Sequence, residues 1–189
     1  TVIILILGVK THMDLGTWKS SKTLWEGALT VNPQNHYAMY SLSLACFAEE
    51  RNPEKALKYL DQAIGLKEDF QYFNNRGRIR YAVRDLQGAI EDFDKSIKID
   101  SNSFAAYNNR GAVNQQLGNY KTALTDYNKA IALNSRYDEA VNNRRKVLHL
   151  MFLDSLLNNN LSIPPEIKGD VAAFIEKTSQ ICINKQDFE

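Results

Sequence analysis

The fold of this 189-residue chain is decided by one stretch, FAAYNNRGAVNQQLGNYKTALTDYNKAIALN, which occupies residues 104–134. Gly118 and Asn119 divide the stretch into two halves, because glycine readily adopts the left-handed backbone in which helices end. In the second half the apolar residues recur three or four positions apart, the spacing of an amphipathic helix. The stretch therefore predicts two helices joined by a tight turn.

The same pattern recurs along the chain at a fixed step. The tripeptide Asn-Asn-Arg begins at Asn74, Asn108 and Asn142, at equal intervals, and it holds six of the 18 asparagines. Small residues keep this interval, at Gly77 and Gly111 in the first half of the unit and at Ala89 and Ala123 in the second. An internal repeat of this length predicts a solenoid in which helix pairs stack on their neighbours.

The unit resembles the tetratricopeptide repeat (TPR), a 34-residue helix–turn–helix. Its pattern of aromatic, glycine, alanine, aromatic and small residue is occupied by Phe73, Gly77, Ala89, Phe93 and Ser96, and again by Tyr107, Gly111, Ala123, Tyr127 and Ala130. The chain departs from the motif at its terminal proline, which is replaced by Ser101 and Ser135. The resemblance implies an all-α fold, a right-handed α-solenoid of TPR repeats with flanking capping helices.

We divide the chain by this register. The expected parts are a hydrophobic helix end at 1–14, an N-terminal capping helix at 15–35, TPR units at 36–69, 70–103 and 104–137, a C-terminal capping helix at 138–160, and a loop with a short helix at 161–189. The first unit is the most divergent, with Ser43 or Leu44 in the glycine position. Arg145 replaces the glycine after the third tripeptide, as expected of a terminal cap.

Residues 2–9, VIILILGV, form a continuous apolar run that is too short to cross a membrane alone. Two interpretations stay open: the end of a transmembrane helix, or a short buried helix or strand. Residues 5–11 and 18–25 resemble the junction between the last membrane helix and the TPR tail of integral-membrane glycosyltransferases. That resemblance implies a non-catalytic tail on the extracytoplasmic side, with membrane anchorage N-terminal of Lys10. The lysines that follow the run favour a cytoplasmic flank, so the side stays open.

The repeat geometry suggests a function, because the first helices of stacked pairs line a concave groove. The second asparagine of each tripeptide is expected to face this groove, where a side-chain amide can bond both the N–H and the C=O of an extended peptide. TPR proteins use an asparagine at this position for peptide binding, so the resemblance implies the same. The alternative is that these amides bond within the solenoid or to water. The expected peptide-binding residues are Asn74, Asn75, Arg78, Tyr81, Asn108, Asn109, Ala112, Gln115, Asn142, Asn143, Lys146 and His149.

One mode of TPR binding fits poorly. The family includes a clamp of Lys and Arg side chains that binds a C-terminal carboxylate, but the matching positions here carry Gln71, Ala105, Glu139 and Asn143. We expect instead an extended, polar, acidic segment of a protein partner. Self-association through the Trp18–Trp25 region or the apolar start is the alternative function.

Other classes of function find little support. The net charge of +1 argues against a nucleic-acid partner, which requires a basic excess. His12, His36 and His149 share no metal-ligand spacing, and the sequence has no phosphate-binding loop or nucleophile motif. We therefore expect no enzyme activity, cofactor or metal. Cys46 and Cys182 are far apart, and we expect two independent thiols, Cys46 being buried.

The arginine of each tripeptide has a separate prediction. Asp92 follows Arg76 at the same separation at which Asp126 follows Arg110, so an ion pair between the two helices of a unit is expected. The alternative is a pair of solvated surface charges that contributes little.

Overall fold

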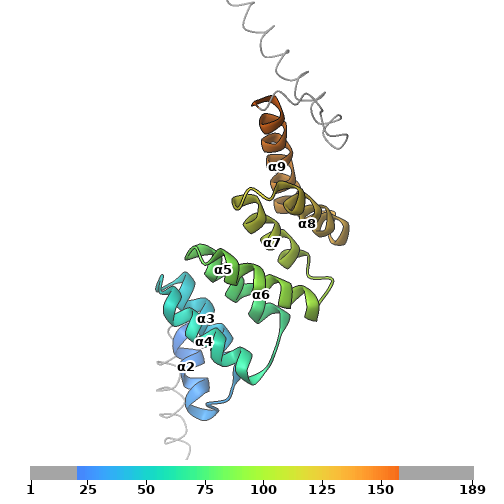
Figure 1. Cartoon of the computed structure of the whole chain (residues 1–189). Helices are drawn as coiled ribbons and strands as arrows, with labels where there is room; N and C mark the ends of the chain where they lie inside the picture. Colours follow the sequence, from blue (N-terminus) through green and yellow to red (C-terminus); the bar gives the residue numbers. More distant parts are fainter. Residues whose placement is uncertain (1–20, 158–189) are drawn as a thin grey trace, which may run out of the picture.

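The computed structural model describes residues 21–157, and these form a single stack of antiparallel helices with no strand among them (Figure 1). The helices are α2 (Ser21–Val31), α3 (His36–Ala48), α4 (Pro53–Leu66), α5 (Phe70–Ala82), α6 (Leu86–Ile99), α7 (Phe104–Gln116), α8 (Tyr120–Leu133) and α9 (Asp138–Leu157). The helices pack in pairs, as α3–α4, α5–α6 and α7–α8. The all-α solenoid predicted from the repeat is therefore confirmed.

Local sequence signals fix where the helices begin. The side chains of Asn35, Asn52, Asp69 and Asp85 each accept a hydrogen bond from a backbone N–H in the first turn of the following helix. These bonds satisfy donors that a helix leaves unpaired at its start. Pro53 opens α4, where its missing N–H costs nothing.

The turn between the two helices of each unit uses one residue with positive φ. This residue is Arg51 (φ 51°), Arg84 (φ 69°) and Gly118 (φ 78°) in successive units. Glycine adopts this conformation without steric cost, whereas the first two units tolerate it at an arginine. The turn geometry is thus repeated although its residue is not.

Within a unit, the two helices approach closely at the glycine. A Cβ atom on Gly77 would lie 2.7 Å from a ring carbon of Phe93, and one on Gly111 would lie 2.8 Å from a ring carbon of Tyr127. In the first unit, burial decides which of two residues stands at the glycine position. Ser43 is fully buried, whereas Leu44 is 37% exposed. Ser43 therefore takes the glycine position, and its hydroxyl has no hydrogen-bond partner within the described residues.

The core runs the length of the stack rather than forming one centre. Ala56, Ala89 and Ala123, the central small residues of the second helices, are all fully buried. Cys46 is a buried free thiol, as predicted, and burial raises its pKa. α9 continues the first-helix pattern and then runs on, so that it is 20 residues long.

Several predictions concern residues outside 21–157: the apolar stub at 1–14, the loop with a short helix at 161–189, and Cys182. None of the helices between Ser21 and Leu157 has the length and apolar character needed to cross a membrane.

Candidate functional site

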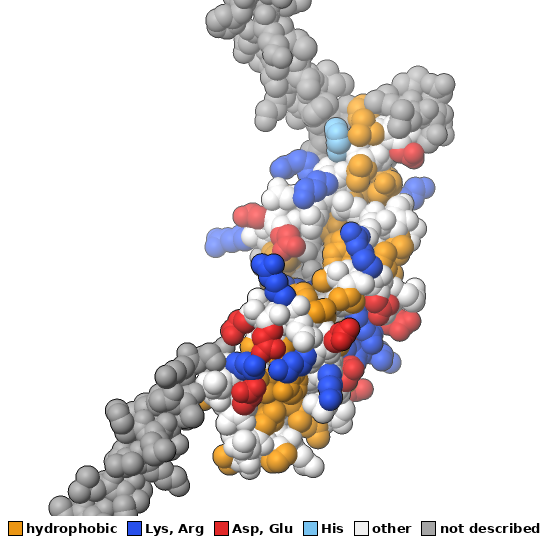
Figure 2. All heavy atoms as spheres, turned by 90° about the vertical axis from the view of Figure 1, so that its left-hand side faces the viewer, with side chains coloured by type: hydrophobic (Ala, Val, Ile, Leu, Met, Phe, Trp, Pro, Cys, Tyr) orange, Lys and Arg blue, Asp and Glu red, His pale blue; other side chains and the backbone are white. Residues whose placement is uncertain are grey.

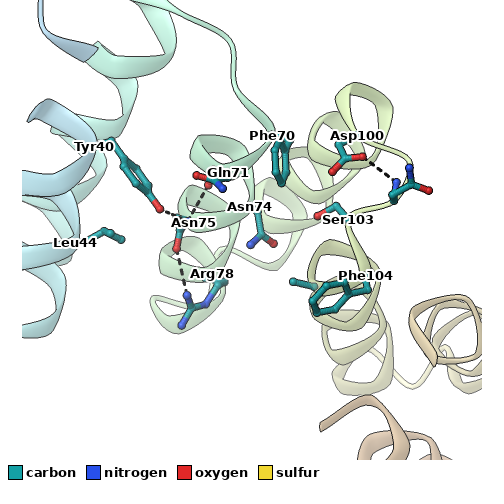
Figure 3. Close-up of a pocket in the computed structure, with 12 residues that line it drawn as sticks. Tyr40, Leu44, Phe70, Gln71, Asn74, Asn75, Arg78, Asp100, Ser103 and Phe104 are labelled. Atoms are coloured by element: carbon teal, nitrogen blue, oxygen red, sulfur yellow. Dashed lines mark hydrogen bonds between the residues drawn. The ribbon is translucent and has the colours of Figure 1, made fainter. Parts of the chain in front are cut away.

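The first helices of the units, α3, α5 and α7, together line a cavity of about 570 Å³. Asn74, Asn75 and Arg78 of α5 and the loop before α7 contribute to its lining. Aromatic rings border it, from Tyr40 of α3, Phe70 of α5 and Phe104 of α7, as the close-up shows (Figure 3). The site is therefore a groove with polar amides inside and apolar rings at its edge.

A ladder of side-chain amides connects the first helices of neighbouring repeats. The Nδ2 group of Asn109 donates to Oδ1 of Asn74 at 3.0 Å, and that of Asn143 donates to Oδ1 of Asn108 at 3.1 Å. Asn75 makes the equivalent bond to the hydroxyl of Tyr40, at 3.1 Å. Every bond joins two residues at the same separation along the chain. In each case the second asparagine of a repeat donates to a side chain of the preceding repeat. The acceptor stands at the position of the first asparagine in that repeat.

The three second asparagines differ in what they can still offer a ligand. Both N–H groups of Asn75 are engaged, because its Nδ2 also donates to the Gln71 carbonyl at 2.8 Å, and its Oδ1 already accepts one bond, from Arg78 at 3.1 Å (Figure 3). Asn109 and Asn143 each make a single side-chain hydrogen bond within the described residues. Within residues 21–157, one N–H and the carbonyl oxygen of each of these amides make no other side-chain hydrogen bond.

A second cavity, of about 400 Å³, continues the groove toward the C-terminal end of the stack. It is lined by Tyr81, Ala112, Gln115, Gln116, Tyr127, Asn143, Lys146 and Leu150. The hydroxyl of Tyr127 donates to Oε1 of Gln115 at 2.9 Å, and burial raises the pKa of Tyr127. Each cavity therefore contains one cationic side chain, Arg78 in the first and Lys146 in the second.

The structure distributes the twelve predicted residues unevenly. The first cavity contains Asn74, Asn75 and Arg78, and the second contains Tyr81, Ala112, Gln115, Asn143 and Lys146. Asn109 is half-buried in the ladder, and the exposed Asn142 and His149 line neither cavity. Asn108 is fully buried and donates to Oε1 of Glu139 at 3.2 Å, so a ligand cannot reach it. The expectation that Asn108 contacts peptide is corrected accordingly.

The sequence analysis missed the rings at the edge of the first cavity. Phe70 and Phe104 stand at the first position of α5 and of α7, so the repeat register was the signal that could have found them. Tyr40 was also missed. It stacks on Tyr72 with the ring centroids 4.7 Å apart, and burial raises the pKa of both hydroxyls.

The charged side chains of this groove differ from those of a carboxylate clamp. Glu139 occupies a position where the clamp needs a lysine, and its Oε2 accepts a hydrogen bond from Tyr137 at 2.8 Å. Burial, followed by this bond, raises the pKa of Tyr137 to about 12. Figure 2 shows one long face of the stack, on which side chains of both signs alternate without forming a patch of one sign. This face therefore offers no single-sign patch for binding by bulk charge.

The predicted ion pairs within the second and third units are present. Arg76 donates to the Asp92 carboxylate from Nε and Nη2, at 2.9 and 2.6 Å, and Arg110 binds Asp126 in the same bidentate way. Asp92 is 1% exposed, so this pair is buried rather than a solvated surface pair. Burial lowers the pKa of Arg76, but hydrogen bonds and charge from Asp92 and Asp61 outweigh it and raise the pKa overall.

Family models for the tetratricopeptide repeat match residues 7–69, 77–118 and 104–137. This chain is a TPR repeat protein. TPR domains are scaffolds for protein interactions, and TPR proteins are generally non-catalytic.

Known proteins agree with this assignment. A TPR repeat-containing protein of Methanocaldococcus jannaschii is 38% identical over 50 residues, a match that spans 26% of this chain and 9% of that protein. A crystal structure of MamA superposes with a TM-score of 0.63 at 17% identity, over 92% of this chain and 94% of MamA. The first TPR of Spaghetti (RPAP3), bound to the HSP90 peptide SRMEEVD, superposes with a TM-score of 0.60 at 18% identity, over 62% of this chain and 94% of that one.

Proposed function

We propose that this TPR protein binds an extended, polar segment of another polypeptide along the groove formed by α3, α5, α7 and α9. The observation that carries the proposal is the pair of cavities that follow one another along these helices. They present amides, one cation each and bordering rings. An extended chain offers N–H and C=O groups at regular intervals, and the free amide groups of Asn109 and Asn143 can pair with both.

The charge of the groove suggests the character of the ligand. Arg78 and Lys146 are exposed, and neither forms an ion pair with a carboxylate within the described residues, so acidic side chains of a ligand would pair with them. Spaghetti (RPAP3) was solved with an acidic peptide, SRMEEVD, which supports a peptide ligand in this fold. The clamp positions differ in this chain, and Glu139 would repel a terminal carboxylate. We therefore propose an internal acidic segment rather than a free C-terminus.

The test uses the full chain and a displayed library of unstructured peptides. Peptides selected by the wild-type chain should be enriched in Asp and Glu and should bind along the groove. Arg78→Ala with Lys146→Ala should weaken their binding about tenfold or more, because charge-assisted hydrogen bonds are lost. Lys121→Ala with Lys129→Ala is the matched control, since both of these lysines are exposed on α8 and line neither cavity.

The proposal fails if the groove and control variants bind the selected peptides equally well. It also fails if the selected peptides bind only through a free C-terminal carboxylate, which amidation of that terminus would reveal.

Attachment of the TPR domain to a membrane is proposed from the sequence alone. The apolar run at 2–9 supports membrane attachment of a TPR domain that is the non-catalytic part of a larger membrane-anchored protein. None of the three proteins named above is described as a glycosyltransferase, so that suggestion rests on the short resemblance of residues 5–11 and 18–25. Membrane fractionation of cells that express the natural protein with and without residues 1–14 tests the attachment.

A further inference from the structure

The end of the groove at α3 differs in chemistry from the rest. Three equivalent positions of the first helices are occupied by Tyr37, Tyr40 and Leu44 in α3, by Gln71, Asn74 and Arg78 in α5, and by Glu139, Asn142 and Lys146 in α9. The amide ladder shows that Tyr40 and Asn74 correspond, because each accepts a bond from the asparagine 35 residues further on. The groove therefore has one apolar, aromatic end, whereas α5 and α9 present polar and charged groups.

Two large side chains at this end are exposed to solvent. Tyr37 is 53% exposed and Leu44 is 37% exposed. Their spacing in the sequence places both on the face of α3 that carries Tyr40. Tyr40 and Leu44 line the first cavity. Exposed apolar groups that gather beside a cavity, unlike apolar residues scattered singly, indicate a surface that a partner covers.

The rings at this end are held in place before any ligand binds. Tyr40 stacks on Tyr72, with the ring centroids 4.7 Å apart, and its hydroxyl accepts the bond from Nδ2 of Asn75. Tyr37 contacts Trp25 edge-on, with the centroids 5.4 Å apart. A preformed surface loses little conformational freedom on binding, so an apolar side chain that docks there gains affinity.

A cation in the same cavity decides which ligand group lies next to the apolar one. Arg78 lines the cavity with Leu44 and Phe104, and it lies between them in the view of Figure 3. Aromatic faces also attract cations, but Arg78 would repel one here. The cavity thus favours an uncharged apolar side chain with an acidic residue beside it.

The second cation sets the distance to a further acid. Arg78 and Lys146 stand at the same position of α5 and α9. α5 contacts α7, and α7 contacts α9. Packed helices lie about 10 Å apart, so the two cations are separated by about 20 Å. An extended chain advances about 3.4 Å per residue, and about six residues span this distance.

We propose that the first cavity takes one aliphatic or aromatic side chain of the bound peptide, in contact with Tyr40, Leu44 and Phe104. An acid beside this anchor residue pairs with Arg78, and a second acid about six residues away pairs with Lys146. The inference rests on the proposed function and adds the residue that fixes the register of the peptide. Amides that bind backbone groups accept any register, because every residue offers the same N–H and C=O.

The experiment uses the full chain and the peptides that it selects from the displayed library, with both termini capped. An apolar residue beside an acid, and a second acid about six residues away, should recur among them. Replacing the apolar residue with Ser should weaken binding about tenfold, because its burial is lost. Tyr37→Ala with Leu44→Ala should weaken the parent peptide similarly. The same variant should hardly affect the Ser-substituted peptide, since both changes remove one contact.

Leu66→Ala with Ile99→Ala is the matched control. These side chains are 44% and 45% exposed, lie on the second helices α4 and α6, and line neither cavity. The control variant should bind the parent peptide as the wild type does. A peptide whose second acid is moved by two residues should lose affinity and should no longer respond to Lys146→Ala.

The possible results separate this inference from the peptide-binding proposal. The inference is overturned, and peptide binding stands, if Arg78→Ala with Lys146→Ala weakens binding but the selected peptides lack the apolar residue. It is also overturned if Tyr37→Ala with Leu44→Ala acts no more strongly than the control, or if the spacing of the acids has no effect. Failure to select any peptide overturns both proposals. A change in sedimentation of the ligand-free chain on Tyr37→Ala with Leu44→Ala would assign the apolar surface to a second copy and would overturn the inference.

Discussion

The buried arginine–aspartate pair of the second unit makes the sharpest prediction of stability. Asp92 is 1% exposed and accepts hydrogen bonds from Nε and Nη2 of Arg76, at 2.9 and 2.6 Å. Nη1 of Arg80 lies 3.0 Å from the same carboxylate. Asp92→Asn keeps the shape of the side chain but turns an N–H group toward these cations. Breaking a buried pair by changing one partner costs about 3–5 kcal/mol. Arg76 retains Asp61, so we expect a loss of about 3 kcal/mol.

Asp94→Asn is the matched control. Asp94 is on the same helix and binds Nη1 of Arg110 at 2.6 Å, but its side chain is 53% exposed. Exposed pairs contribute about 0–1 kcal/mol, so this change should cost less than about 1 kcal/mol. Its small effect should also shrink as salt is added, because exposed charges are screened, whereas the effect of Asp92→Asn should persist.

The assay is urea unfolding of the full chain, followed by far-ultraviolet circular dichroism at neutral pH. Both variants are compared with wild type at low and high salt. A third protein, with Arg76→Met and Asp92→Leu together, should be more stable than Asp92→Asn, because it leaves fewer buried charges unpaired. The reasoning is refuted if Asp92→Asn costs less than about 1 kcal/mol, the bound for an exposed pair, or no more than Asp94→Asn.

Two further predictions concern packing and pH. Gly111→Ala should destabilise the protein by about 1–3 kcal/mol in the same urea assay, because the new Cβ would lie 2.8 Å from a Tyr127 ring carbon. Gly65→Ala, a helical glycine with no atom within 4 Å of the new Cβ, should instead stabilise by up to about 1 kcal/mol, and equal effects of the two changes would contradict the packing argument. Tyr137 has its pKa raised to about 12, chiefly by burial, against about 10 in an unfolded chain, so the folded state retains the proton more strongly. Its contribution to stability is complete below pH 10 and is lost as the pH rises toward 12. Tyr137→Phe should therefore reduce the alkaline fall in stability, and an ultraviolet titration in which all tyrosines ionise together near pH 10 would show the opposite.

Part of the candidate site could be predicted because it repeats. Eight of the twelve expected groove residues line the two cavities, because positions at the same place in the repeat unit lie on the same face of equivalent helices. The pairing of Arg76 with Asp92 was also predictable, since both charges recur at the same separation in the next unit. Asn108 was not predictable in this way. Its register equals that of Asn74, yet it is fully buried, because Glu139 and Tyr137 cover it and bond to its amide.

The sequence by itself determined that the chain is a helical solenoid, how long each unit is, and which charges pair within a unit, because the constant repeat step and the helical period assign each residue to a helix face. The tertiary structure alone decided what lies between units. It joins Asn109 to Asn74 and Asn143 to Asn108, surrounds a polar cavity with aromatic rings, and leaves the Nε of Arg144 without an acceptor among the described residues. The physical reason is that contacts between units depend on how far each helix pair is displaced and rotated against the next. That offset follows from the packing of all the side chains between the units, and no single spacing along the sequence specifies it.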